Sequence, residues 1–197
     1  MHRSVSGVDY LRWRDDMRQA IDGYMPRVQA IFARFGQLEP DTVSDEVDSV
    51  ALRKAGEVDP PLPRTLLELY ASIREASFAH LHNAYFIHSL DLVLDGLHRS
   101  GIPAWAPEVT DERLAVFASD GGGRMFAVGY RSGTVFRLPV GAVVDKVYDC
   151  SIDSIGPGEI AKDIPDFLDR LLGIAQAFSE EDDEDDDEDD DEERAIL

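Results

Sequence analysis

Three histidines lie close together in the segment SFAHLHNAYFIHS and could act as metal ligands. His80 and His82 would share one face of an extended segment, as two zinc ligands can, and His88 follows with Asp91 nearby. A third and a fourth ligand do not occur at a spacing typical of zinc sites. We therefore predict no metal and no cofactor, and interpret the histidines as ordinary core or surface residues. A histidine-based metal protein or enzyme is the least favoured alternative.

A glycine run after an apolar strand pattern offers a second chemistry. Asp120, Gly121, Gly122 and Gly123 could cradle a phosphate with backbone N–H groups, but a phosphate loop runs from a strand into a helix and usually offers a lysine. Here a strand pattern stands on both sides, and no lysine is near. We interpret the run as a hairpin turn, because glycine supplies the positive φ angles that tight turns require.

Nucleophilic catalysis has little support in the residue pattern. The single cysteine, Cys150, lies in VYDCSIDS without a visible base partner, and no G-x-S-x-G sequence occurs. One cysteine cannot form an internal disulfide, and paired carboxylates arise by coincidence in a chain with 40 Asp and Glu residues. We predict that the protein is not an enzyme, because no nucleophile, base and orienting group can be named together.

A tryptophan between two prolines points to the binding of another protein. Trp105 lies in the segment IPAWAP, and tryptophan on a stiff loop makes a good interface anchor. The alternative is that its ring closes the end of the core. Arg124 and Tyr130, at the two ends of one predicted strand, could join it on a binding face, although Arg124 could equally pair with an acid. The predicted partner-binding residues are Trp105, Asp120, Gly121, Gly122, Gly123, Arg124 and Tyr130.

The elements that must position these residues begin with a long apolar stripe. Its members recur at steps of three and four, which predicts a helix with one buried face: Trp13, Met17, Ala20, Ile21, Tyr24, Val28, Ile31, Phe32 and Phe35. Gly23 and Pro26 interrupt the stripe and predict a kink or two consecutive helices. The acidic stretch 39–58 predicts a thin peripheral helix, which Asp41 would cap and to which Val43 would contribute an apolar side chain.

The rest of the chain contains further helix patterns around a series of strands. PRTLLELYASI and LDLVLDGLHRS predict helices, the second capped by Ser89, and AYFIH between them favours a strand. RLAVFAS, RMFAVGYR and TVFRLP alternate and are separated by glycine turns, which predicts three antiparallel strands, with VVDKVY as a further strand or edge. DIPDFLDRLLGIAQAF, behind the candidate cap Asp163, predicts a closing helix. This order predicts an α+β fold with a single twisted sheet, antiparallel or mixed, flanked by helices.

The composition separates an acidic C-terminal tail from the rest of the chain and disfavours some classes of partner. The 197 residues have a net charge of −21, and residues 180–193 are all Asp or Glu. This charge disfavours direct nucleic-acid binding, and neither a signal-peptide pattern nor a run of roughly 18 apolar residues points to export or to a membrane. We expect a cytoplasmic protein with an N-terminal helical extension (1–58), an α+β domain (59–179) and a disordered acidic tail (180–197).

The acidic tail allows three interpretations. Adjacent like charges keep it unfolded at neutral pH, so it could serve solubility alone. It could instead steer a basic partner, such as a nuclease toxin, with an effect that salt screens. Divalent cations could also bind its carboxylates, although the glycine turn of an EF-hand loop is missing. The sequence does not decide among these roles and does not fix the oligomeric state.

The order of the predicted elements resembles the SUKH superfamily, also called the Smi/Knr family. The likeness rests on LPRTLLELY, a strand, WAP…LAVFASDGGGRMFAVGYRSGTVFRL and IAKDIPDFLDRLL, and it covers about residues 62–172. Its most specific part is the glycine hairpin followed by G-T-V-F and a closing F-L-x-x-L helix. The chain departs from the family at Arg124, where members often carry an acid, and after Tyr70, where ASIREAS stands in place of N-G.

The resemblance implies a twisted antiparallel sheet flanked by helices and a role in binding. Many bacterial members act as immunity proteins that neutralise a toxin from the same locus, and others are regulatory or scaffold modules. We therefore expect a non-catalytic module that docks a protein partner, such as a basic toxin, in a sheet-side cleft around Trp105, residues 120–124 and Tyr130. A regulatory or scaffold protein of the same fold that binds a host protein is the alternative.

Overall fold

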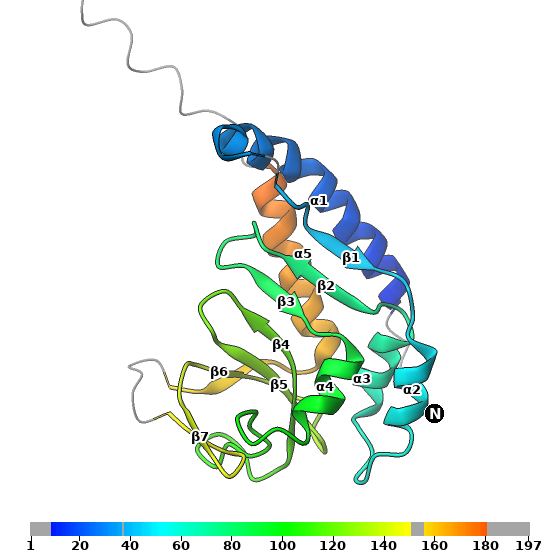
Figure 1. Cartoon of the computed structure of the whole chain (residues 1–197), viewed down its shortest axis with the longest axis vertical. Coiled ribbons are helices and arrows are strands. Elements are labelled where there is room, and N and C mark those ends of the chain that lie inside the picture. The colour runs from blue at the N-terminus through cyan, green and yellow to red at the C-terminus, as the bar shows by residue number, and fades with distance from the viewer. Residues whose placement is uncertain (1–8, 37, 151–155, 181–197) are drawn as a thin grey trace, which may run out of the picture.

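The protein has an α+β fold, as the sequence predicts (Figure 1). The computed structural model describes residues 9–36, 38–150 and 156–180. The helices in this part are α1 (Tyr10–Phe32), the short 3₁₀ helix η1 (Ala33–Phe35), α2 (Ser49–Ala55), α3 (Arg64–Tyr70), α4 (Leu90–Gly96) and α5 (Ile164–Glu180). The strands are β1 (Thr42–Ser44), β2 (Glu75–Phe78), β3 (Tyr85–Ile87), β4 (Leu114–Asp120), β5 (Met125–Gly129), β6 (Val135–Leu138), β7 (Ala142–Val144), β8 (Val147–Asp149) and β9 (Gly158–Ala161).

These strands form two sheets. The larger one has seven strands in the order β1-β2-β3-β4-β5-β6-β9, and every neighbouring pair is antiparallel. β7 and β8 form a separate hairpin. The segment VVDKVY is therefore not the one further strand of a single sheet that the sequence predicts, because Asp145 and Lys146 form a turn between two short strands. Among the described residues, none of the helices combines the length and the apolarity that a membrane crossing needs.

α1 is one continuous helix and not two consecutive ones. Asp9 caps its start, and Pro26 lies inside it. Figure 1 shows its last turns running in a different direction from the rest, which agrees with the predicted kink. The predicted stripe is buried only as far as Val28. Its last three members are exposed because this end of α1 extends past the sheet, and they are Ile31, Phe32 and Phe35.

The segment after α1 contains a strand where the sequence pattern predicts a helix. β1 pairs with β2, with Val43 opposite Ala76, and α2 begins only at Ser49. Asp48 caps α2 by accepting hydrogen bonds from two backbone N–H groups, so the predicted cap, Asp41, has another role. β-Branched Val43 can pair with the otherwise free edge of β2, and this tertiary contact outweighs the local helix pattern.

The central strands confirm the predicted hairpins. β4, β5 and β6 pair in succession, with a register shift in β4 between Val116 and Ala118. One face of these strands packs on α5, where the rings of Phe117 and Phe167 meet edge to face with centroids 5.5 Å apart. The other face is covered by the β7–β8 hairpin, whose Tyr148 is buried in a second apolar cluster. Because both faces are covered, nearly every residue of β4 is buried.

Helix α5 closes the core and joins it to α1. Asp163 caps α5, as predicted, by accepting a hydrogen bond from the Asp166 N–H at 2.8 Å. The indole N–H of Trp13 donates to the Leu168 carbonyl at 2.8 Å, which ties α1 to α5 in the interior. α1, β1, the central strands and α5 all contribute to one apolar core. The predicted boundary after residue 58 therefore does not separate two cores.

The acidic tail lies almost entirely outside the described residues. Glu180, its first residue, is the last residue of α5. Residues 181–197, which carry the rest of the predicted tail, lie beyond the described part of the chain.

Candidate functional site

The predicted binding residues lie at two ends of the sheet and do not line one cleft. Residues 120–124 include the turn before β5, and Tyr130 directly follows β5 at its other end. β5 has five residues and therefore spans about 17 Å. Trp105 lies on the Tyr130 side, because the neighbouring Ala104 carbonyl accepts a hydrogen bond from the Leu114 N–H, where β4 begins. The single sheet-side cleft that the sequence suggests is therefore two separate surfaces.

The glycine run is a hairpin turn, as predicted. Asp120 is buried, and one of its carboxylate oxygens accepts hydrogen bonds from the Gly122 N–H at 3.0 Å and the Arg124 N–H at 2.9 Å. The other oxygen accepts from Nε of Arg124. Gly123 has a φ of 81°, in the left-handed region that favours glycine, and Gly121 packs against the turn between β2 and β3. These residues shape the hairpin, and they leave Arg124 half-buried at its edge.

Substitution of Gly121 by alanine is expected to lower the free energy of unfolding by about 2 kcal/mol, because of overpacking. A Cβ at this position would lie 2.5 Å from the carbonyl oxygen of Asn83, which cannot move without shifting the β2–β3 turn. Chemical denaturation measures the loss. Gly101→Ala is the matched control, since a Cβ there meets nothing within 4 Å. Equal losses in the two variants would contradict a packing role for Gly121.

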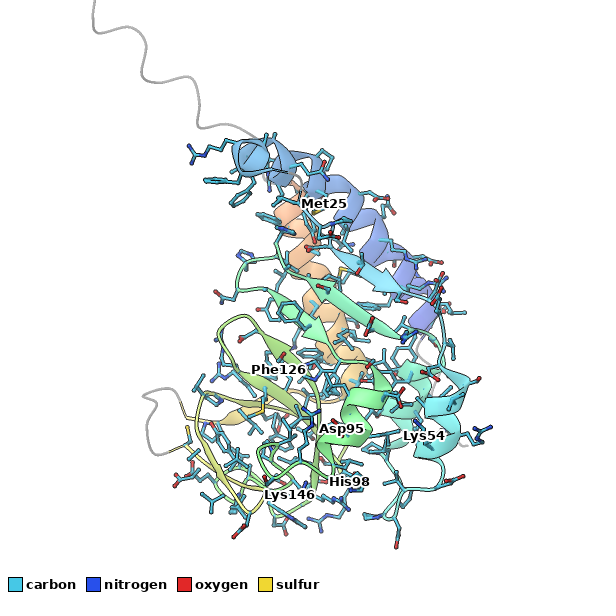
Figure 2. All side chains as sticks on the ribbon, viewed as in Figure 1. Met25, Lys54, Asp95, His98, Phe126 and Lys146 are labelled. Carbon is cyan, nitrogen blue, oxygen red and sulfur yellow. The ribbon has the colours of Figure 1, made fainter. Side chains whose placement is uncertain are left out.

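A pocket of about 210 Å³ lies between α5 and the sheet, beside the glycine turn. Three arginines from separate elements line it, namely Arg124 from the turn, Arg137 from β6 and Arg170 from α5, and we call it the arginine pocket. Figure 2 shows Phe126, which belongs to its wall. Its other lining residues are mostly apolar: Tyr85, Asp120, Phe126, Ile160, Phe167, Leu171 and Ile174. The pocket can therefore hold a small anionic group against an apolar wall.

The three arginines differ in their partners. Arg124 and Arg170 each form an ion pair with the aspartate four residues earlier in the chain. The Nε of Arg137 is buried, and no hydrogen-bond acceptor contacts it among the described residues. Sequence reasoning missed Arg137 and Arg170. Arg137 could have been found from the alternation of TVFRLP, because alternate residues of a strand share a side and Arg137 therefore lies on the same side as buried Val135.

A second surface feature consists of exposed apolar side chains at the other end of the sheet. Trp105 is 42% exposed, so its ring does not close the core. Trp105 forms a backbone bridge to Val147 of β8, and Val147 pairs with Val144 of β7. Val144 is 65% exposed and Val147 is 39% exposed. We call Trp105, Val144 and Val147 the Trp105 patch.

The loop that carries Trp105 is held firmly in place. The Trp105 N–H donates to the Lys146 carbonyl at 3.1 Å, and the Tyr148 N–H donates to the Trp105 carbonyl at 2.8 Å. Lys146, labelled in Figure 2, also donates through Nζ to the carbonyls of Leu97 at 2.6 Å and Arg99 at 3.0 Å, just beyond α4. The loop, the β7–β8 hairpin and the end of α4 therefore form one fixed support for the Trp105 patch.

Tyr130 is half-buried and contributes packing near this end of the sheet. The guanidinium carbon of Arg113 lies 5.2 Å from the centroid of its ring, within cation–π range. Burial raises the pKa of the Tyr130 hydroxyl, so it stays protonated at neutral pH, although the Arg113 charge acts in the opposite direction. Tyr130 is therefore a weaker candidate for a binding contact than Trp105.

The three histidines do not converge on one point. Nδ1 of His80 lies 2.9 Å from Oδ1 of Asp41, and Nε2 of His88 lies 2.9 Å from the Ser119 hydroxyl. The His82 ring packs on a phenylalanine of α5. Burial lowers the pKa of His88, which lines an apolar pocket of about 240 Å³. Within the described ranges, no group of three or more His, Cys, Asp or Glu side chains could hold a metal ion.

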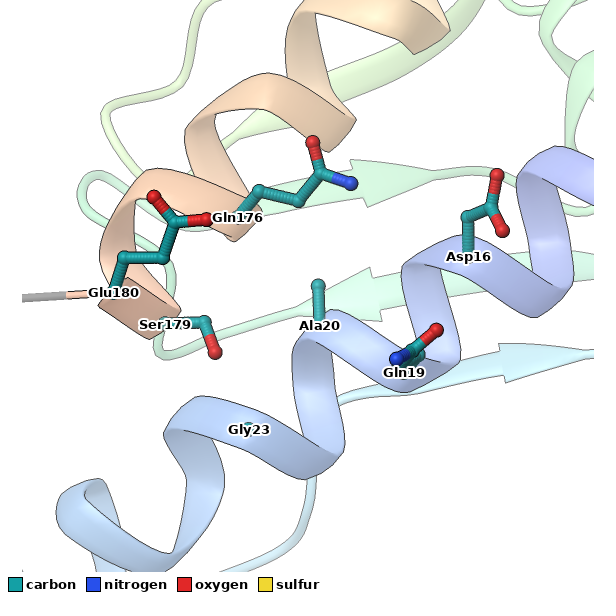
Figure 3. A pocket seen from close by; sticks show the side chains of 7 residues that line it. All are labelled: Asp16, Gln19, Ala20, Gly23, Gln176, Ser179 and Glu180. Atoms are coloured by element: carbon teal, nitrogen blue, oxygen red, sulfur yellow. The ribbon is translucent and has the colours of Figure 1, made fainter.

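Another hollow lies between α1 and α5 (Figure 3). It has a volume of about 350 Å³ and is lined by Asp16, Gln19, Ala20, Gly23, Gln176, Ser179 and Glu180. Figure 3 shows Asp16 and Glu180 at opposite ends of the hollow, so these carboxylates are not placed for joint acid–base chemistry. No basic side chain lines it. The arginine pocket and the Trp105 patch are the two surfaces on which several candidate binding residues meet.

Comparison with known proteins adds no family assignment. No protein-family model matches the chain, and no curated protein matches it. The SUKH resemblance stays a prediction that rests on the order and spacing of residues in this sequence.

Proposed function

We propose that this protein is a non-catalytic, cytoplasmic binding module that holds a partner protein against the Trp105 patch. The partner is a toxin that the protein neutralises by direct binding. The observation that carries the binding role is the exposed ring of Trp105 on a loop with a fixed backbone. The choice of a toxin rests on the SUKH resemblance of residues 62–172.

The Trp105 patch has the properties of an interface anchor. Tryptophan buries a large area with few rotatable bonds and is enriched among residues that dominate binding energy. Asp145 and Lys146 form the turn between β7 and β8 with positive φ angles of 49° and 66°, as in tight two-residue hairpins. The hairpin therefore presents Val144 and Val147 in a fixed register beside the ring. A partner would bury these apolar side chains without first having to order the loop.

Trp105→Ala is expected to weaken binding of the toxin by about 2 kcal/mol, roughly 30-fold in the dissociation constant. The loss arises because the variant removes the largest apolar side chain of the patch and leaves the fold intact. Isothermal titration calorimetry with an inactive variant of the toxin encoded by the neighbouring gene measures it.

The matched control is Phe32→Ala, which removes an aromatic ring with the same 42% exposure from the distant end of α1. Its affinity for the toxin should equal that of the unmodified protein. An unchanged affinity for Trp105→Ala would remove the Trp105 patch from the interface. Absence of binding by the unmodified protein would exclude the toxin as its partner.

A further inference from the structure

The arginine pocket of this strongly acidic protein contains one guanidinium group that has no carboxylate partner among the described residues. The chain has 19 Lys and Arg residues against 40 Asp and Glu residues, yet three guanidinium groups line this one pocket. Asp120 and Asp166 pair with Arg124 and Arg170. Arg137 forms no ion pair or hydrogen bond through its side chain within the described residues, and its Nε is buried. Arg137 therefore lines the pocket with a guanidinium charge that no carboxylate of the described residues pairs, and an anionic group in the pocket would supply that partner.

The acidic tail begins on the same helix that forms one wall of the arginine pocket. Arg170 and Ile174 line the pocket, and α5 continues from them to Glu180. The rise from Ile174 to Glu180 is about 9 Å along the helix axis. Five extended residues span about 17 Å, so the first part of the tail is long enough to return to the pocket. Every residue from 181 to 193 is Asp or Glu, so any returning segment brings carboxylates.

We propose that the acidic tail folds back along α5 and places carboxylates in the arginine pocket, with Arg137 as their main partner. A carboxylate accepts hydrogen bonds from a guanidinium in a planar, charge-assisted arrangement, which suits the unpaired guanidinium of Arg137 at the pocket. Attachment to α5 gives the tail an effective concentration in the millimolar range at the pocket. The tail therefore occupies the pocket ahead of free anions and of acidic side chains on other proteins.

This role differs from the steering of a basic partner. A docked tail has part of its charge neutralised by Arg137, so fewer carboxylates remain to attract a basic surface. The arginine pocket and the Trp105 patch lie at different ends of the sheet, and the docking of the tail does not depend on the proposed toxin. High salt should release the tail from the pocket, because at 1 M salt the Debye length is about 3 Å and the attraction between carboxylates and arginines is screened.

The test uses the full chain with a nitroxide label in the tail. Glu188→Cys provides the attachment site, and Cys150→Ala removes the other cysteine. Amide NMR signals are compared with those of the same protein carrying a diamagnetic label. We expect the label to broaden the amides of Phe126 and Arg137, which lie on strands and not on α5, at low salt. At 1 M salt these signals should become sharp again.

Variants of the pocket decide whether the arginines hold the tail. Arg137→Gln should restore sharp amide signals at Phe126. Arg170→Gln gives the same test if Arg137→Gln folds poorly, because the Arg170 side chain is exposed and its substitution should not disturb the fold. Arg74→Gln is the matched control, because the Arg74 Nε is also buried without a hydrogen-bond acceptor among the described residues. Sharp signals in the unmodified pocket at low salt would overturn the proposal. Broadening of the Phe126 signal that persists in both pocket variants would also overturn the proposal. Trp105→Ala is a further control, and it should show the same broadening as the unmodified protein.

Discussion

Trp13→Ala is expected to lower the free energy of unfolding by about 4 kcal/mol. Trp13 is only 4% exposed, and its indole N–H donates to the Leu168 carbonyl at 2.8 Å. The variant therefore loses a large buried ring and leaves a buried carbonyl without its partner. Urea denaturation followed by circular dichroism measures the loss.

Two further variants separate the causes of this effect. Trp13→Phe keeps most of the apolar volume but removes the N–H, so a loss of about 2 kcal/mol is expected. Leu11→Ala changes the same helix at a side chain that is 49% exposed, and it should have little effect. Trp13→Ala should still unfold in one transition, because α1 and α5 share one core. An early, separate loss of the helix signal would contradict the shared core.

Asp41→Ala is expected to cost about 3 kcal/mol of stability, because several donors lose a buried acceptor together. Asp41 is 4% exposed and accepts hydrogen bonds from the Tyr24 hydroxyl at 2.5 Å and from the His80 backbone N–H at 3.2 Å. Nδ1 of His80 is a third neighbour, 2.9 Å from Oδ1. Burial raises the pKa of the Tyr24 hydroxyl, and the hydrogen bond to Asp41 raises it further, so Tyr24 remains a donor at neutral pH. Thermal and urea denaturation both report the loss.

The controls for Asp41 distinguish the loss of an acceptor from the loss of charge. Asp41→Asn keeps one oxygen acceptor and should retain part of the stability. Asp45→Ala removes a neighbouring aspartate that lies at the surface and pairs with Arg18, and its effect should be much smaller. A loss for Asp41→Ala no larger than that for Asp45→Ala would show that the buried contacts contribute little.

The parts of the fold that could be predicted from the sequence are those that neighbouring residues specify. The glycines between RLAVFAS, RMFAVGYR and TVFRLP specify the hairpins, and Ser89 and Asp163 specify two helix starts. β9 is not readable in this way, because GEIA is a strand only through its pairing with β6. Val43 is a similar case, since its neighbours look helical and the edge of β2 decides its conformation.

The candidate surfaces were predictable only in part, because each depends on contacts between distant segments. Trp105 could be singled out from its two flanking prolines, but its exposure depends on its bridge to Val147 of β8. The pocket around Arg137 requires the β5–β6 register and the position of α5, which bring Phe126 and Arg170 to the same place. No short sequence pattern contains that information.

The bond between Trp13 and Leu168 also constrains how the chain can fold during its synthesis. The two residues are 155 positions apart, so α1 leaves the ribosome long before its partner helix exists. At a synthesis rate of roughly 5–20 residues per second, the apolar face of α1 waits about 8 to 30 s for α5. During that interval the nascent chain exposes this face to other proteins and to chaperones. The core that α1 and α5 share is completed only after α5 has been synthesised.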